Sequence, residues 1–167
     1  MLVDSLIVPQ CVYRPGTFTG LMSLYESSYI KLRQLAVELR WSPDAIISAP
    51  IRDHALHAEI LRREPYTTTL RLTYWLSDEG GAVVPEPDLV LRIYHDARLV
   101  EAVSCAESLR NAKLRELARD SHTELGRRWQ LNMLLNKWLD YLFEVGHSLE
   151  GADRLAAHRA ARPGSLL

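Results

Sequence analysis

The chain has 167 residues, of which 47% are hydrophobic and 25% charged, ordinary proportions for a single globular domain. Twenty Lys and Arg residues against 21 Asp and Glu residues give a formal net charge of −1, so we expect no strong attraction to nucleic acid or to an anionic membrane. The two cysteines, Cys11 and Cys105, are too few for a disulfide framework or a four-cysteine zinc site. We therefore expect a reduced, cytoplasmic protein, and no sequence feature predicts a cofactor or a bound metal.

The N-terminal part of the chain is predicted to be an arm followed by a helix. Residues 1–17 contain two prolines and no sustained period, which favours an irregular arm. Helical spacing then predicts a helix that begins at Thr19 or at a capping box on Ser23, and that ends near Arg40 because Pro43 follows. The side chains of its buried stripe are Leu21, Leu24, Ser28, Leu32, Leu35 and Leu39.

From residue 45 the hydrophobic period changes to two, which is typical of strands. Candidate strands cover residues 45–51, 55–60, 66–76, 89–94 and 99–104. A turn is predicted at residues 62–65, a polar loop over residues 78–87 and a tight connection at residues 95–98. Links this short favour an antiparallel meander of four or five strands.

The remaining chain is again helical in pattern. A first helix is predicted over residues 106–118, and a stronger one follows a capping box at Ser121 and ends before a left-handed Gly146. The stripe of this stronger helix comprises Leu131, Leu134, Leu135, Trp138, Leu139, Leu142 and Val145. We expect one domain over residues 18–148 and a tail over residues 149–167, either a frayed helix or disordered.

The order of helix, strands and helices predicts an α+β fold with the helices packed mainly on one face of an antiparallel sheet. The side chains expected to meet the helices are Leu70, Leu72, Leu89, Leu91 and Ile93. Those expected on the opposite face are His57, Glu59, Thr67, Thr69, Arg71, Thr73, Trp75, Arg92 and Tyr94.

Two interpretations of this opposite face remain open. Its threonine ladder is typical of a solvated face. Alternatively, Arg71 and Arg92 form a charge clamp and Trp75 and Tyr94 an aromatic platform, which predicts a non-enzymatic binding module for a protein partner or a small anionic metabolite. The two aromatic residues also suit the core of a homodimer interface.

An enzymatic alternative rests on the polar cluster at residues 94–97. His95 is a candidate general base with Asp96 or Glu101 orienting it, which predicts a hydrolase or transferase acting on a nucleotide-like phosphorylated substrate. A simple turn, in which the Asp96 side chain bonds to the backbone, explains the same residues.

Two further patterns argue against other chemistries. His54 and His57 lie where the period is two, so alternation sends them to opposite faces and disfavours a shared zinc ion. Gly146-His147-Ser148 has Glu150 where a nucleophile elbow requires glycine.

The strongest helix carries a polar stripe at Asn132, Asn136 and Asp140. This stripe is either the solvated side of the helix or a hydrogen-bonding strip for a ligand or for sheet backbone. The neighbouring pair Arg127 and Arg128 is too mixed with acidic residues to predict nucleic-acid binding.

Residues 92–97, Arg-Ile-Tyr-His-Asp-Ala, with Glu101-Ala102-Val103, resemble the Tyr-His-Asp-Ala…Glu-Val signature of the YqiB-like family, a bacterial domain of unknown function. Residues 129–147 are similar to that family's Gln-Leu-Asn…Trp-Leu…Gly helix. The first helix and the strand at Tyr66 also fit, so the resemblance covers roughly residues 20–148. It implies a small cytoplasmic proteobacterial protein with no established activity.

The chain departs from this pattern at two places. Residues 109–111 stand where relatives carry Tyr-Pro-Asn, and residues 127–129 stand where they carry Asp-Glu-Lys. The resemblance therefore implies a divergent member.

Overall fold

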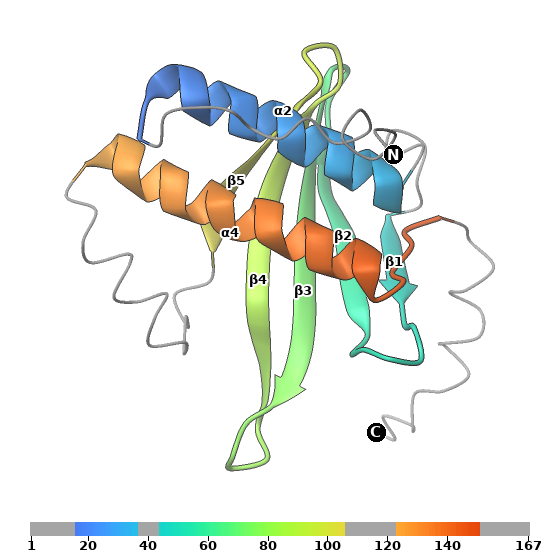
Figure 1. Ribbon diagram of the computed structural model, residues 1–167. Coiled ribbons are helices and arrows are strands. Elements are labelled where there is room, and N and C mark those ends of the chain that lie inside the picture. Colours follow the sequence, from blue (N-terminus) through green and yellow to red (C-terminus); the bar gives the residue numbers. More distant parts are fainter. Residues whose placement is uncertain (1–15, 37–43, 106–122, 151–167) are drawn as a thin grey trace, which may run out of the picture.

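The computed structural model describes residues 16–36, 44–105 and 123–150 and places them in one sheet and two helices (Figure 1). The helices are α2 (Phe18–Leu35) and α4 (Glu124–Glu144). The strands are β1 (Ala45–Ser48), β2 (Leu56–Arg63), β3 (Thr67–Ser77), β4 (Val83–Tyr94) and β5 (Leu99–Cys105). The helix predicted over residues 106–118 lies outside the described residues, as do most of the predicted arm and tail.

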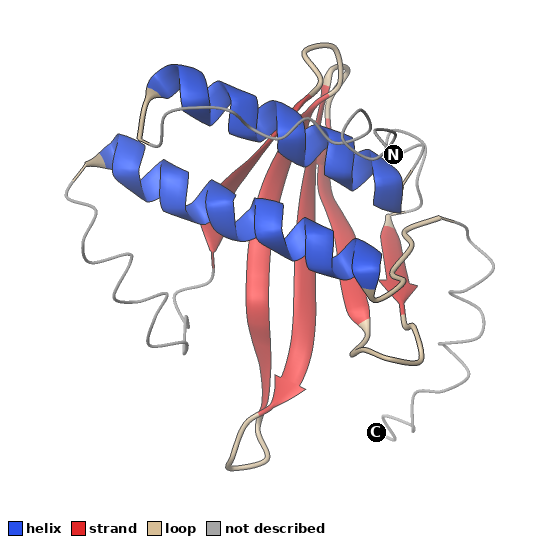
Figure 2. Cartoon of the chain, in the orientation of Figure 1, coloured by secondary structure: helices blue, strands red, loops and turns tan. Residues whose placement is uncertain are grey.

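The strands form one antiparallel sheet in the order β1-β2-β3-β4-β5, so each strand pairs with the next along the chain. This is the meander that the short links predict. Both described helices cross the same face of the sheet, and Figure 2 shows them as one layer in front of the strands. The predicted α+β architecture is therefore confirmed.

Alternation along β3 and β4 directs the apolar side chains toward the helices. Leu70 pairs with Leu91 and Leu72 with Leu89, so these four side chains lie on one face of the sheet. All four, and Ile93 beside them, are at most 1% exposed and pack into the same core as side chains from both helices. Each such leucine contributes about 1.5–3 kcal/mol on burial, which makes this face the main source of stability.

The β3–β4 hairpin is longer than predicted. Instead of a loop over residues 78–87, β4 begins at Val83, and Pro85 opposes Trp75 across the hairpin. The described pairing of β4 with β5 starts only at Leu89. Proline is tolerated on this stretch because no described strand there requires its missing N–H group. The hairpin therefore extends past the helix layer, toward the bottom of Figure 1.

The turn between β2 and β3 also differs from the prediction. β2 continues to Arg63, beyond the expected end at residue 60, and β3 begins at Thr67. Tyr66, expected to begin the third strand, consequently belongs to the turn and is exposed. Its carbonyl accepts the N–H of His95, which links this turn to the end of β4.

Both helices begin at a threonine, not at the predicted serines. Thr17 caps α2 and Thr123 caps α4, and each hydroxyl accepts the backbone N–H three residues further on. Ser23 lies inside α2, where its hydroxyl donates to the carbonyl of Thr19. The starts predicted for α2 at Thr19 and at a capping box on Ser23 are therefore wrong. Ser121, the residue expected to cap α4, lies outside the described residues, and the described cap is Thr123.

The C-terminal ends of the helices are set by different contacts. α2 ends at Leu35, and not near Arg40, because Ala36 is extended and the Leu35 carbonyl accepts the N–H of Leu149 at 2.7 Å. The segment after α4 thus replaces the next turn of α2. At the end of α4, Gly146 adopts a φ of +90°, as its position predicts.

The polar stripe of α4 is engaged with α2. The Asn136 amide donates to the hydroxyls of Ser27 and Ser28, both at 3.1 Å. The Lys31 ammonium donates to Asn136 Oδ1 at 2.7 Å and to Asp140 Oδ2 at 2.6 Å. These buried bonds set the alignment of the two helices, because a slip along either axis would leave buried polar groups unpaired.

Asn132, the first member of the same stripe, binds the backbone of edge strand β5. Its Oδ1 accepts the N–H of Ala102 at 2.7 Å, while its Nδ2 donates to the Ala102 carbonyl at 3.4 Å. The side chain is completely buried. Of the two interpretations of the polar stripe, hydrogen bonding to sheet backbone is therefore confirmed for Asn132. Through this contact α4 protects part of the open edge of the sheet.

Trp138 provides a test of this helix orientation. Its indole packs edge-on against Tyr74 at a centroid distance of 5.5 Å and is 7% exposed. We predict that Trp138→Ala lowers the free energy of unfolding by about 3–5 kcal/mol in urea denaturation. Phe143→Ala, which removes an exposed ring from the same helix, is the control and should change the stability by less than about 0.5 kcal/mol. Equal stability of the two variants would contradict the packing of α4.

Candidate functional site

The face of the sheet opposite the helices carries the sequence-predicted binding residues. Neither α2 nor α4 covers it (Figure 1). Arg71 lies on β3 and Arg92 on β4, with about one third and one half of their side chains exposed. Trp75 is 44% exposed, and Tyr94 is partly buried. The four residues are therefore on the uncovered face, and we call this surface the outer face.

Arg71 is already paired on the outer face. Its Nε donates to Asp88 Oδ1 and its Nη2 to Asp88 Oδ2, both at 2.7 Å, a two-bond fork. Thr73 donates a third bond to this carboxylate at 2.6 Å. The guanidinium also lies 6.0 Å from the ring centroid of Trp75, at cation–π distance. Arg71 thus fixes Asp88 and borders Trp75, and the Asp88 carboxylate neutralises its charge within the protein.

Arg92 and Tyr94 gather around a different carboxylate. Glu101, on β5 directly opposite Arg92, has a side chain only 10% exposed. The Tyr94 hydroxyl donates to Glu101 Oε1 at 2.7 Å, whereas Arg92 Nη1 lies 3.8 Å from the same oxygen. The predicted clamp is therefore divided: Arg71 belongs with Asp88 and Trp75, and Arg92 belongs with Tyr94 and Glu101.

Two residues from the helices join Glu101 at the edge of the sheet. Arg128 of α4 places Nη1 3.7 Å from Glu101 Oε2. Tyr25 of α2 is 4% exposed, and burial, followed by the charge of Glu101, raises the pKa of its hydroxyl. We call Tyr25, Arg92, Tyr94, Glu101 and Arg128 the β5-edge cluster. Sequence reasoning missed the two helical members because nothing local relates them to residues 92–101.

The three residues of the enzymatic alternative, His95, Asp96 and Glu101, occupy different surroundings. His95 Nε2 lies 2.8 Å from the hydroxyl of Thr68, which is buried beside Ile93 on the helix side of the sheet. Glu101 instead bonds to Tyr94, whose strand position places it on the outer face. Asp96 is exposed in the connection between β4 and β5. The structure thus directs His95 and Glu101 toward different sides of β4.

A buried network after α4 was not anticipated. His147 Nε2 lies 2.9 Å from Asp53 Oδ2, and because a carboxylate only accepts, this nitrogen carries the proton. His147 Nδ1 lies 3.0 Å from the Ser48 hydroxyl, and Tyr74 and Tyr141 also donate to Asp53. Burial raises the pKa of Asp53, but these donated bonds outweigh it and the net pKa is lowered.

The Ser48–His147–Asp53 arrangement has the residue types of a hydrolase triad but lacks an accessible nucleophile. Ser48 is 1% exposed, and its hydroxyl also accepts the N–H of Ser148 at 3.1 Å. Its role in the structure is to fasten the segment after α4 onto β1. The pair Gly146-His147 was visible in the sequence, but its partners lie about a hundred residues away and only the fold brings them together.

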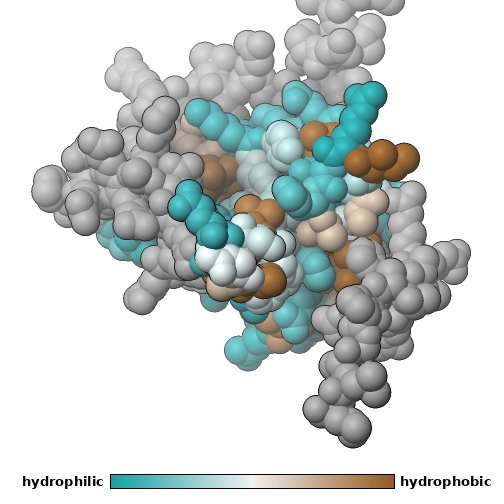
Figure 3. Space-filling model, turned by 90° about the horizontal axis from the view of Figure 1, so that it is seen from below, coloured by the Kyte–Doolittle hydropathy of each residue, from teal (hydrophilic) through white to brown (hydrophobic). Residues whose placement is uncertain are grey.

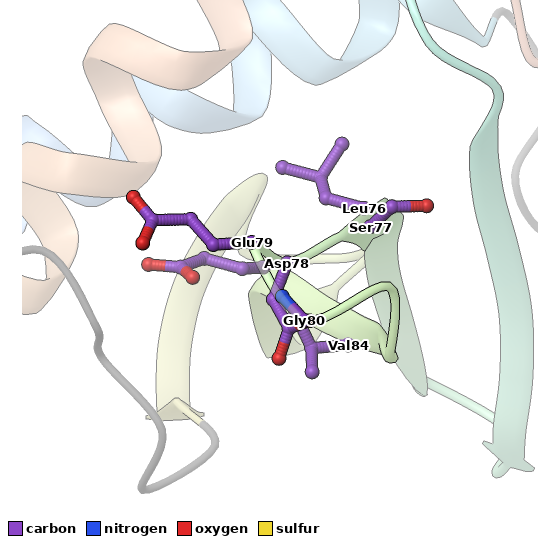
Figure 4. Close-up of a pocket in the computed structure, with 7 residues that line it drawn as sticks. Leu76, Ser77, Asp78, Glu79, Gly80 and Val84 are labelled. Atoms are coloured by element: carbon purple, nitrogen blue, oxygen red, sulfur yellow. The ribbon is translucent and has the colours of Figure 1, made fainter.

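A hollow of about 400 Å³ lies at the tip of the β3–β4 hairpin, and none of the predicted site residues lines it (Figure 4). Its acidic lining residues are Asp78, Glu79 and Glu86. Asp78 Oδ1 accepts the N–H groups of Gly80 and Ala82, so this carboxylate shapes the turn. Hydrophilic and hydrophobic side chains are mixed over the described part of the lower end of the molecule (Figure 3). The hairpin tip thus shows no feature of a built site beyond its acidity.

This fold and this arrangement define a small α+β domain whose two described helices lie on one face of the sheet and whose other sheet face is polar. The family model for the Protein of unknown function (DUF1249) matches residues 31–148, and the chain belongs to this family. The search of curated proteins and the search of solved structures each found no match. Among the described segments, neither helix has the length and apolar character needed to cross a bilayer.

The Arg71–Asp88 pair predicts an acid-sensitive contribution to stability. Burial raises the pKa of Asp88, but the bonds from Arg71 and Thr73 outweigh it, so the folded pKa lies below the ordinary 3.8. The contribution is therefore complete above the unfolded pKa and is lost as the pH falls through the folded value. We predict that Asp88→Asn is less stable than the wild type by about 1–3 kcal/mol at pH 7, and that this gap narrows below pH ~3.8.

Urea denaturation of both proteins between pH 7 and pH 2.5 measures this gap. A gap that stays constant over the whole range would show that the ionisation of Asp88 contributes nothing to the fold.

Proposed function

We propose that the protein is a non-enzymatic binding module whose outer face takes a protein partner or an anionic metabolite. The observation that carries the proposal is the half-exposed Arg92 beside Tyr94 on a face that the described helices leave uncovered. Trp75 adds an exposed ring on the same face.

The chemistry of these side chains suits recognition. A guanidinium matches the geometry of carboxylate and phosphate groups, and aromatic rings provide rigid contact area at little entropic cost. Because Arg71 is bound to Asp88, the charge available on the outer face comes chiefly from Arg92. Arg71 contributes indirectly by bordering Trp75 and by holding the β3–β4 surface in a defined shape.

The enzymatic alternative receives less support from the geometry. A hydrolase or transferase with His95 as general base needs a carboxylate and an arginine in reach of that ring. The contact defined for His95 Nε2 is the Thr68 hydroxyl on the helix side, while Arg92 and Glu101 face the outer side and the sheet edge.

A second copy of the chain is one of the protein partners that the proposal includes, with Trp75 at the centre of the contact.

Arg92→Ala tests the proposal directly. We predict that at least one member of a panel of phosphorylated and carboxylated metabolites raises the melting temperature of the wild type, and that Arg92→Ala removes this rise. The unliganded variant should melt within a few degrees of the wild type, because Arg92 is about half exposed. Arg33→Ala, which removes an equal charge from the exposed side of α2, is the control and should retain the rise.

Two results would contradict the proposal. One is an Arg92→Ala variant that responds to every panel member as the wild type does. The other is turnover of a panel member that His95→Ala abolishes, which would establish the enzymatic alternative.

A further inference from the structure

The β5-edge cluster holds two arginines around one carboxylate at unusually loose distances. Arg92 Nη1 and Arg128 Nη1 lie 3.8 Å and 3.7 Å from opposite oxygens of Glu101. Arg71 and Asp88, by comparison, meet at 2.7 Å through two bonds. A charge-assisted N–H···O bond is normally about 2.7–2.9 Å long, so Glu101 attracts both guanidiniums without saturating either of them.

Among the described residues, the carboxylates do not fully neutralise the two arginines of the cluster. Glu124 accepts from both Arg127 and Arg128 at 2.9–3.1 Å, so Arg128 shares that carboxylate with its neighbour. Because Arg127 also occupies Glu124, Arg92 and Arg128 are left to share the single carboxylate of Glu101 and only part of Glu124, so their charge is incompletely neutralised. Glu64, which also acts on Arg92, is paired with Arg62 at 2.8 Å. An anion is the ligand that this excess charge would attract.

A buried hydroxyl provides the second, independent observation. The Tyr25 hydroxyl is buried, and no hydrogen bond of ordinary length satisfies it within the described part of the chain. Its nearest polar neighbours are Arg128 and Glu101, whose weak hydrogen-bonding contacts with the hydroxyl shift its pKa in opposite directions. Buried hydroxyls are rarely left unpaired, because burial removes their hydrogen bonds to water without replacing them. An acceptor placed between Arg128 and Tyr25 would relieve this cost.

Resting on the proposed function, we propose that the β5-edge cluster is a phosphate-binding site, with Arg92 and Arg128 as the charged donors and the Tyr25 hydroxyl as a third donor. Glu101, already bonded to Tyr94, positions the two guanidiniums. The ligand class is a phosphate monoester or free phosphate, and not a simple carboxylate. The donors come from three separate elements, α2, α4 and β4, and a tetrahedral oxyanion has enough oxygens to accept from all three, whereas one arginine fork satisfies a planar carboxylate.

The test measures the dissociation constant of inorganic phosphate by calorimetry, with acetate at equal ionic strength as the comparison anion. We expect saturable phosphate binding that acetate does not reproduce. Arg92→Ala and Arg128→Ala should each weaken it by about tenfold or more, because each removes a charge-assisted bond. Tyr25→Phe should weaken it by several-fold while keeping the ring in the core.

Arg127→Ala is the matched control, since it removes the same charge from the adjacent position of α4. Its Nε and Nη2 contact Glu124, and it is about half exposed. It should bind phosphate within about twofold of the wild type. Arg92→Lys and Arg128→Lys keep the positive charge but lose the two-bond geometry of the guanidinium. They should also weaken phosphate binding, and they test the site even if the alanine variants fail to fold.

The outcomes separate this inference from the broader proposal. If Arg92→Ala weakens binding but Arg128→Ala and Tyr25→Phe do not, the outer face binds the anion and the β5-edge site is overturned. If Arg127→Ala weakens binding as much as Arg128→Ala, the attraction is only general charge, and the site is again overturned. Absence of saturable phosphate binding in the wild type also overturns it, while the metabolite panel still tests the outer face.

Discussion

The structure depends on one constraint: a five-strand meander is covered on a single face by both described helices. Leu70, Leu72, Leu89 and Leu91 face that layer, so the residues between them necessarily face away from it. A one-residue slip in any of these strands would exchange the two faces and expose the core. The same register that buries the leucines therefore also holds Arg92 and its neighbours on the outer face, so the stability of the sheet and the position of the candidate site have one origin.

Much of this fold could be predicted from residue spacing because its elements are long and periodic. The period of two over β3, β4 and β5 defined the sheet, and the leucine stripes defined both helices. The ends of the elements were less predictable, since they depend on distant partners. α2 ends at Leu35, whose carbonyl accepts the N–H of Leu149 instead of one from a further helical turn. Pro85 is tolerated in β4 because the described part of β5 does not pair with that stretch. Thr17 and Thr123 compete with nearby serines as caps, and local sequence does not decide between them.

The candidate site shows the same division. Alternation correctly assigned Arg71, Trp75 and Arg92 to one face, but it carried no information on which carboxylate each arginine meets. That choice follows from register, which places Asp88 beside Thr73 and Glu101 beside Arg92. The residues that the helices contribute to the candidate site, Tyr25 and Arg128, could not be predicted, because they come from segments far along the chain from Glu101. Sequence reasoning likewise dismissed His147, whose buried partners become apparent only in three dimensions.

The polar groups of α4 connect the two halves of this account. Asn132 holds β5 by its backbone, and Arg128, one turn earlier on α4, reaches Glu101 on the same strand. The helix that protects the sheet edge therefore also brings a cation to it. Because the family to which the chain belongs has no known function, the chemistry of the candidate site has to be inferred from such contacts.

The most direct measurement is an amide chemical-shift titration of the ¹⁵N-labelled protein with inorganic phosphate. The account predicts that saturable shifts concentrate at residues 92–94, 99–101 and 127–129, where β4, β5 and α4 meet. Shifts confined to the β3–β4 hairpin tip, or spread evenly over all exposed basic residues, would contradict it.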